Sequence, residues 1–83
     1  MSRIQNNIRQ LRATKPMTQS ELADLIGVTR QTVAAIESDK YSPSLEVAFL
    51  IAHVFDVHLE EVFQFTPPRA KRNRLSERMK KTI

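Results

Sequence analysis

The chain has 83 residues, with 13 Lys or Arg against nine Asp or Glu, a net charge of +4 and no cysteine. This length allows one small domain with a single core, and without cysteine neither a disulfide framework nor a thiolate metal site can stabilise it. The longest apolar run, Val47 to Ala52, is far shorter than the roughly 20 residues of a membrane span. No apolar signal-peptide region follows the N-terminus, so we expect a cytoplasmic protein.

The first predicted helix begins close to the N-terminus. Ile4, Ile8 and Leu11 have the spacing of one apolar stripe on a helix. Ser2 and Gln5 have the spacing of a capping box, which predicts that this helix starts beside Ser2.

A second capping box, formed by Thr18 and Glu21, predicts the start of a second helix. Three apolar residues would form its inward face: Leu22, Leu25 and Ile26. Gly27 follows them and can adopt the left-handed conformation that ends a helix at little cost.

A third helix is predicted to begin at Thr29, a good N-cap residue, with Val33 and Ile36 facing inward. Two short helices joined by a short turn that contains glycine have the spacing of a helix-turn-helix unit. In such a unit the second helix enters the DNA major groove. Its first turn here carries Arg30 and Gln31, whose side chains can bind guanine and adenine edges in bidentate fashion.

Two further helices complete the predicted fold. Pro43 and Ser44 precede a fourth helix, Leu45 to Phe55, which is apolar nearly all round and should be the central buried one. A short fifth helix should span about Leu59 to Phe65. Because period-two alternation and hairpin turn signals are absent, we expect an all-α domain and no β-structure.

The composition changes after Phe65, which predicts a folded domain at residues 1–65 and a basic tail at residues 66–83. The first part contains six Lys or Arg and eight Asp or Glu, whereas the tail contains seven Lys or Arg and one Glu. Two interpretations of the tail stay open. It is either a flexible basic segment that adds phosphate contacts, or a sixth helix with a stripe of Leu75, Met79 and Ile83.

Four segments, in this order, resemble the Xre-type helix-turn-helix family of phage Cro and repressor proteins: IRQLR, TQSELA, GVTRQTVAAIE and YSPSLEVAFLIAHVFDVHLEEVF. The resemblance covers about Ile4 to Phe65. It implies a five-helix phage-repressor-like domain with the helix-turn-helix at helices two and three. It also implies a sequence-specific regulator of transcription that binds double-stranded DNA, with no cofactor.

The resemblance also implies roles for particular residues. Base contacts would come from Arg30, Gln31 and Ala34, and Gln19 would orient Arg30. Arg12 and Glu37 would form a structural ion pair. Phosphate contacts would come from residues at the helix starts and after the third helix: Thr18, Gln19, Thr29, Thr32, Ser38, Lys40 and Tyr41.

A homodimer is expected because one module reads only a few base pairs, whereas two modules one helical turn apart read a palindrome. Leu50 stands where similar sequences carry a charged residue, so it should add an exposed apolar group to the fourth helix. The candidate dimer interface comprises Leu50, Phe63, Phe65, Leu75 and Met79.

The same residues leave two functions other than transcriptional repression open. His53 and His58 are five residues apart and match no metal motif, and no nucleophile–base arrangement appears, so an enzyme is not expected. An antitoxin that binds a toxin protein through the tail and regulates its own operon is one alternative. A protein-interaction module that lost DNA binding is another, because residues 1–65 are acidic on balance.

Overall fold

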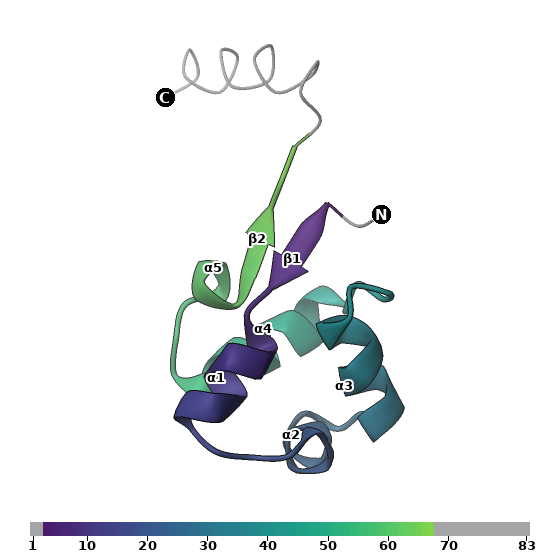
Figure 1. The fold of residues 1–83 in the computed structure, drawn as a ribbon, viewed down its shortest axis with the longest axis vertical. Coiled ribbons are helices and arrows are strands. Elements are labelled where there is room, and N and C mark those ends of the chain that lie inside the picture. Colours follow the sequence, from purple (N-terminus) through teal and green to yellow (C-terminus); the bar gives the residue numbers. More distant parts are fainter. Residues whose placement is uncertain (1–2, 68–83) are drawn as a thin grey trace.

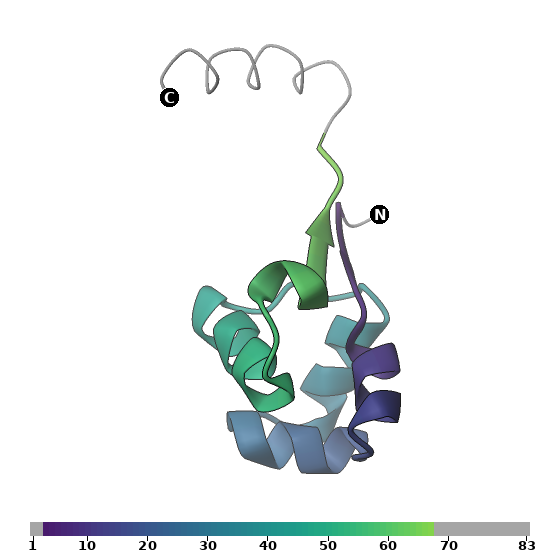
Figure 2. The ribbon, with the colours of Figure 1, turned by 90° about the vertical axis from the view of Figure 1, so that its left-hand side faces the viewer.

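The computed structural model describes residues 3–67, which form five helices and two short strands. In chain order these are β1 (Ile4–Asn6), α1 (Ile8–Thr14), α2 (Gln19–Ile26), α3 (Arg30–Glu37), α4 (Leu45–Phe55), α5 (Leu59–Val62) and β2 (Phe63–Phe65). The strands lie side by side at the end of the domain opposite α2 (Figure 1 and Figure 2). No helix within residues 3–67 is long and apolar enough to cross a membrane.

One apolar core holds the helices together, and every helix contributes to it. Its buried residues are Ile8, Leu22, Ala23, Ile26, Val33, Ile36, Ile51, Ala52, Phe55 and Val62. Burial of aliphatic and aromatic side chains is the main stabilising contribution available to a domain without disulfides. The expected five-helix, predominantly α-helical fold is confirmed.

The predicted starts of α2, α3 and α4 are present. The Thr18 side chain accepts a hydrogen bond from Glu21 N at 3.0 Å, and the Glu21 carboxylate accepts one from Thr18 N at 2.8 Å. The side chains of Thr29 and Ser44 cap α3 and α4 by accepting from Thr32 N and Val47 N, without the reciprocal bond that Glu21 gives α2. Gly27 ends α2 with φ 75°, a left-handed conformation that a side chain would disfavour.

The predicted start of the first helix is wrong. Ile4 and Gln5 belong to β1, and α1 begins only at Ile8, whose backbone N–H donates to Asn6 Oδ1 at 3.1 Å. The supposed capping box therefore does not exist at Gln5, and Ser2 lies outside the described residues.

The end of the domain also differs from the prediction. α5 stops at Val62, and the next three residues form β2 in place of a last helical turn. β1 and β2 pair antiparallel, with Ile4 opposite Phe65 and Asn6 opposite Phe63. The expectation of no β-structure is wrong because the two strands pair through space and need no hairpin turn between them.

Three predictions about apolar side chains also need correction. α4 buries one face and not its whole circumference, since Leu45 is 69% exposed and Phe49 54% exposed. Leu50 is half-buried and packs against the core, so it is not the exposed group that was expected. Leu25, expected to face inward on α2, is 60% exposed. A periodic apolar stripe wider than the contact surface leaves such residues at its edge.

Candidate nucleic-acid interface

α2 and α3 form the predicted pair of short helices, joined by residues 27–29. Two buried side chains, Val33 and Ile36, fix one side of α3 against the core. α3 therefore lies at the surface of the domain, as Figure 1 shows, and its opposite side faces solvent. This is the arrangement that lets a helix enter a major groove while the domain keeps its core.

The residues expected to contact bases share this outward side. Arg30 and Gln31 are exposed and Ala34 is half-buried. Gln31, Ala34 and Ser38 are spaced by three and four residues, so they lie along one stripe of the helix. The small side chain of Ala34 leaves room on this stripe for a base edge to approach the helix.

A buried ion pair joins α1 to α3. Arg12 Nε donates to Glu37 Oε2 at 2.7 Å, and Arg12 Nη2 donates to Glu37 Oε1 at 3.2 Å. The Glu37 side chain is only 1% exposed and that of Arg12 is 18% exposed. A third donor of the guanidinium, Nη1, binds the carbonyl oxygen of Met17 at 3.1 Å. This is the pair that the resemblance implied, and its two parallel bonds satisfy a carboxylate that has lost its water.

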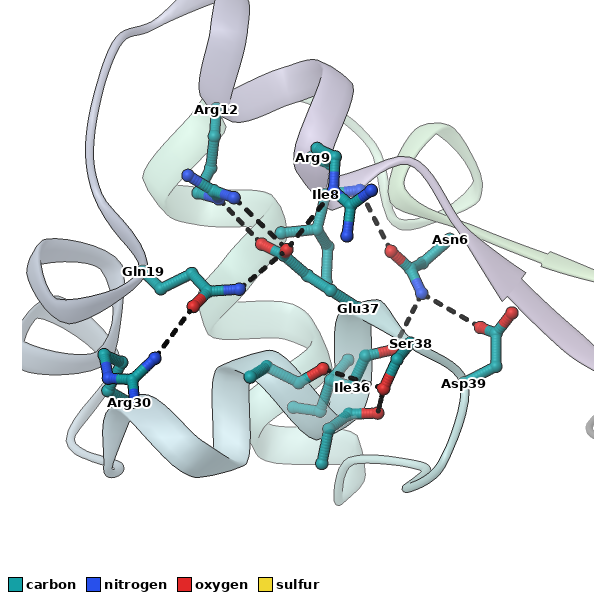
Figure 3. A network of polar contacts seen from close by, with 12 residues as sticks. Asn6, Ile8, Arg9, Arg12, Gln19, Arg30, Ile36, Glu37, Ser38 and Asp39 are labelled. Atoms are coloured by element: carbon teal, nitrogen blue, oxygen red, sulfur yellow. Dashed lines mark hydrogen bonds and ion pairs between the residues drawn. The ribbon is translucent and has the colours of Figure 1, made fainter.

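Gln19 connects that pair to the start of α3. Its Nε2 donates to Glu37 Oε1 at 3.1 Å, and its Oε1 accepts from Arg30 Nη1 at 3.3 Å (Figure 3). Glu37 therefore determines which way the Gln19 amide is turned, and the amide oxygen then holds Arg30. The second hydrogen on Nε2 remains available to a phosphate, because an amide nitrogen carries two.

Several hydroxyl groups expected to contact phosphate already have partners within the protein. The hydroxyls of Thr29 and Thr32 lie 3.0 Å apart, and the Thr29 hydroxyl also accepts from Thr32 N. Ser38 donates its hydroxyl to the carbonyl of Ala34 at 3.0 Å. A phosphate oxygen can only accept, so Ser38 must rotate before it donates to DNA, whereas exposed Lys40 needs no such change.

The loop after α3 carries Lys40 and Tyr41, both exposed, and it is fastened by Asn6 of β1. Asn6 Nδ2 donates to Ile36 O at 2.8 Å and to Asp39 Oδ1 at 3.1 Å. Asp39 itself has φ 61°, a left-handed conformation that is uncommon outside glycine. The strand pair thus contributes directly to the shape of a loop expected to contact DNA.

Positive charge gathers around this network although residues 1–65 are acidic on balance. Arg12 binds Glu37 directly, Arg9 Nε lies 3.9 Å from the same carboxylate, and Arg30 is linked to it through Gln19. Arg9 and Arg30 are thus exposed cations near a carboxylate whose charge Arg12 already compensates. Exposed cations of this kind favour the approach of a polyanion even where the overall charge of a domain is negative.

Comparison with known sequences identifies the family to which this arrangement of helices belongs. A family model described as helix-turn-helix matches residues 8–62. The chain belongs to the Xre-type helix-turn-helix family. It is similar to the uncharacterized HTH-type transcriptional regulator MJ0272 of Methanocaldococcus jannaschii, with 47% identity over 60 residues, 72% of this chain and 91% of that protein. It is also 45% identical over 60 residues, again 72% of this chain and 91% of that protein, to the uncharacterized HTH-type transcriptional regulator YgzD of Bacillus subtilis.

Two solved structures share the fold. The restriction-modification controller protein C.AhdI from Aeromonas hydrophila superposes with a TM-score of 0.60 at 31% identity, over 65% of this chain and 78% of that one. A hypothetical transcription factor, NHTF from Neisseria, also gives a TM-score of 0.60, at 26% identity over 82% of this chain and 75% of that one. The chain is thus a helix-turn-helix transcriptional regulator, a class of DNA-binding proteins and not of enzymes.

The two histidines of this regulator lie apart from the network. His53 is on α4, and His58 precedes α5, where its N–H donates to the Glu61 carboxylate at 2.7 Å. Within residues 3–67 no group of three or more His, Cys, Asp or Glu side chains is placed to hold a metal ion. Glu61 therefore serves as a helix-start acceptor, which agrees with its place in the first turn of α5.

Two polar residues of this network were not among the predicted site residues. Asn6 gave no local signal, because its partners Ile36 and Asp39 are distant in sequence. Arg9 did give one, since it lies three residues before Arg12 and so shares its face of α1. The predicted interface residues Leu75 and Met79, together with any sixth helix, lie outside the described residues.

Proposed function

We propose that the chain is a repressor that binds a palindromic double-stranded DNA site as a homodimer, with α3 of each copy in a major groove. The observation that carries this proposal is the chain of hydrogen bonds from Glu37 through Gln19 to Arg30. It holds an exposed guanidinium at the start of a surface helix before any ligand arrives. A protein that stabilises such a side chain without burying it keeps its donors for another molecule, and guanine offers the matching pair of acceptors.

Repression needs nothing beyond occupancy of the site. A dimer of small modules that covers a promoter prevents another protein from binding there. Phosphate contacts would come mainly from Gln19 at the start of α2 and from Lys40 and Tyr41 after α3, and base contacts from Arg30 and Gln31. Phosphate contacts fix the register of the helix on the duplex, and base contacts then select the sequence.

Exposed apolar side chains support the homodimer. Leu45 and Phe49 on α4 and Phe65 on β2 are all more than half exposed. Near them is a surface hollow of about 290 Å³ with an almost wholly apolar lining: Ile4, Pro43, Leu45, Ala48, Leu59 and Phe63. Apolar groups gathered on one surface indicate an interaction site. Leu50, Phe63 and Phe65 were all expected at the interface. Phe65 is exposed, whereas Leu50 and Phe63 are half-buried and pack against the core.

Selection of bound duplexes from random DNA with the full chain tests this function. The expected product is a palindrome whose half-sites are centred about 10 base pairs, one helical turn, apart. Sedimentation of the selected complex should then give two protein chains per duplex. Enrichment of a single unrepeated half-site, or a complex with one chain, would contradict the dimer, and no enrichment at all would contradict sequence-specific binding. None of the relatives and structures named above has a toxin or antitoxin in its name, so that alternative gains no support.

A further inference from the structure

Arg9 is a charged residue beside the network whose side chain makes few interactions with the described part of the protein. It lies on α1, its side chain is 76% exposed, and its Nε is 3.9 Å from Glu37 Oε1. That separation is too long for a hydrogen bond. Within residues 3–67 its guanidinium makes no hydrogen bond to another side chain or carbonyl, so all five N–H donors remain available.

The ion-pair role that explains Arg12 does not extend to Arg9. Arg12 already meets both oxygens of Glu37, at 2.7 and 3.2 Å, and its side chain is only 18% exposed. The single negative charge of Glu37 is therefore compensated before Arg9 is considered. An exposed cation at 3.9 Å adds little to stability, because water screens the attraction.

Arg9 lies beside one edge of α3, the edge that carries Arg30 and Glu37. Arg30 and Glu37 are seven residues apart, close to two full turns, so they lie on the same edge of α3. Gln19 stands beside this edge and contacts both of them. Arg9 stands beside its Glu37 end, as Figure 3 shows.

That end of the edge would otherwise repel DNA. Besides Glu37, the exposed carboxylate of Asp39 lies there, held by Asn6. Figure 3 shows Arg9 and Asp39 at the same end of the network. Since Arg12 already compensates Glu37, a nucleic-acid strand that follows this edge needs a cation at this point to offset the exposed carboxylate of Asp39.

We infer that Arg9 binds a backbone phosphate of the DNA strand beside α3, so that α1 extends the row of contacts that begins at Gln19. This inference rests on the proposed function. The planar guanidinium suits a phosphate because two of its N–H groups reach two oxygens at once. Since the contact is to the backbone, it strengthens binding to every sequence and selects none.

The test compares variants on two duplexes of equal length, the selected site and a scrambled one, across about 50 to 200 mM salt. Arg9→Ala should weaken binding roughly three- to tenfold on both duplexes and reduce the slope of log affinity against log salt by about 0.9. Arg9→Lys should retain most of the slope, because the charge is kept. Arg3→Ala is the matched control, since it removes the same charge from an exposed residue that precedes β1 and forms no ion pair with Glu37. It should change neither quantity.

Each other result overturns the inference. An unchanged slope for Arg9→Ala shows no phosphate contact, and an equal effect of Arg3→Ala shows a response to net charge alone. A loss confined to the selected duplex shows base recognition. A fall in thermal unfolding midpoint like that of Arg12→Ala shows a structural ion pair. If the wild-type chain binds neither duplex, the proposed function fails as well, which separates that failure from one confined to Arg9.

Discussion

Gln19 Oε1 accepts a hydrogen bond from Arg30 Nη1 at 3.3 Å, which joins the first residue of α2 to the first residue of α3. The bond links the residue expected to meet a phosphate with the residue expected to meet a base. The opposite end of the Gln19 amide is fixed by buried Glu37. An Arg side chain held in this way loses less conformational freedom when it binds, which preserves affinity.

Replacement of Arg30 by alanine should weaken binding to the selected site by about 1–3 kcal/mol and relax the preference at one base pair. The cause is loss of a bidentate contact to a base edge. Titration of the selected duplex and of its single-position variants measures both effects. Arg30→Lys is the control, because it keeps the positive charge but loses the planar guanidinium that binds two acceptors at once. It should therefore be little more specific than Arg30→Ala. Equal losses on selected and scrambled duplexes would show that Arg30 contacts phosphate only.

Replacement of Glu37 by alanine should destabilise the domain by about 3–5 kcal/mol, since it leaves the Arg12 guanidinium partly buried without its carboxylate. Urea unfolding followed by circular dichroism gives the change in unfolding free energy. Glu46→Ala on α4 is a suitable control, because this exposed carboxylate has no hydrogen-bond or ion-pair partner within residues 3–67 and its loss should change stability by less than about 0.5 kcal/mol. If Glu37→Ala cost no more than Glu46→Ala, the ion pair would have no structural role.

Removal of the Asn6 side chain should also destabilise the domain, by about 2–3 kcal/mol. Asn6→Ala loses two bonds from Nδ2, to Ile36 O and to Asp39, and the bond from Ile8 N to its Oδ1. The amides at the end of α3 should then exchange with solvent faster, as measured by hydrogen exchange.

The neighbouring residue offers a matched control for this prediction. Asn7→Ala loses one exposed hydrogen bond, from Nδ2 to Glu61 O at 3.0 Å, and should cost no more than about 1 kcal/mol. Faster exchange at the end of α3 in Asn7→Ala, or normal exchange there in Asn6→Ala, would contradict the role given to Asn6.

The features predicted correctly from the sequence are those that a few neighbouring residues decide. Thr18 and Glu21 form their capping box within one turn, and Gly27 ends α2 by its own conformational preference. The strand pair was missed because Ile4 and Phe65 meet only after the helices have packed. Isolated three-residue strands carry no periodicity that distinguishes them from helical ends.

The candidate nucleic-acid interface shows the same division between features that neighbouring residues decide and features that depend on packing. The outward direction of Arg30 and Gln31 follows from the spacing of Val33 and Ile36 on the same helix. The hydrogen bond from Asn6 to the end of α3 does not follow from any local pattern, because it depends on where β1 lies in the folded domain. On α4 the apolar composition concealed which residues face solvent, since burial depends on the packed neighbours and not on the residue type alone.

Replacement of Phe49 by serine should weaken the homodimer at least about tenfold while the monomer stays folded. The ring is 54% exposed, so the core depends on it only in part, whereas a partner surface would cover it and lose its apolar area. Sedimentation equilibrium over a range of concentrations gives the dissociation constant. Leu25→Ser is the matched control, because Leu25 is 60% exposed on α2, at the opposite end of the domain from the strand pair, and should leave the dimer intact. Affinity for the palindromic duplex should fall with Phe49→Ser, and affinity for a single half-site should not. An unaltered dissociation constant for Phe49→Ser, or dissociation caused by Leu25→Ser, would place the interface elsewhere.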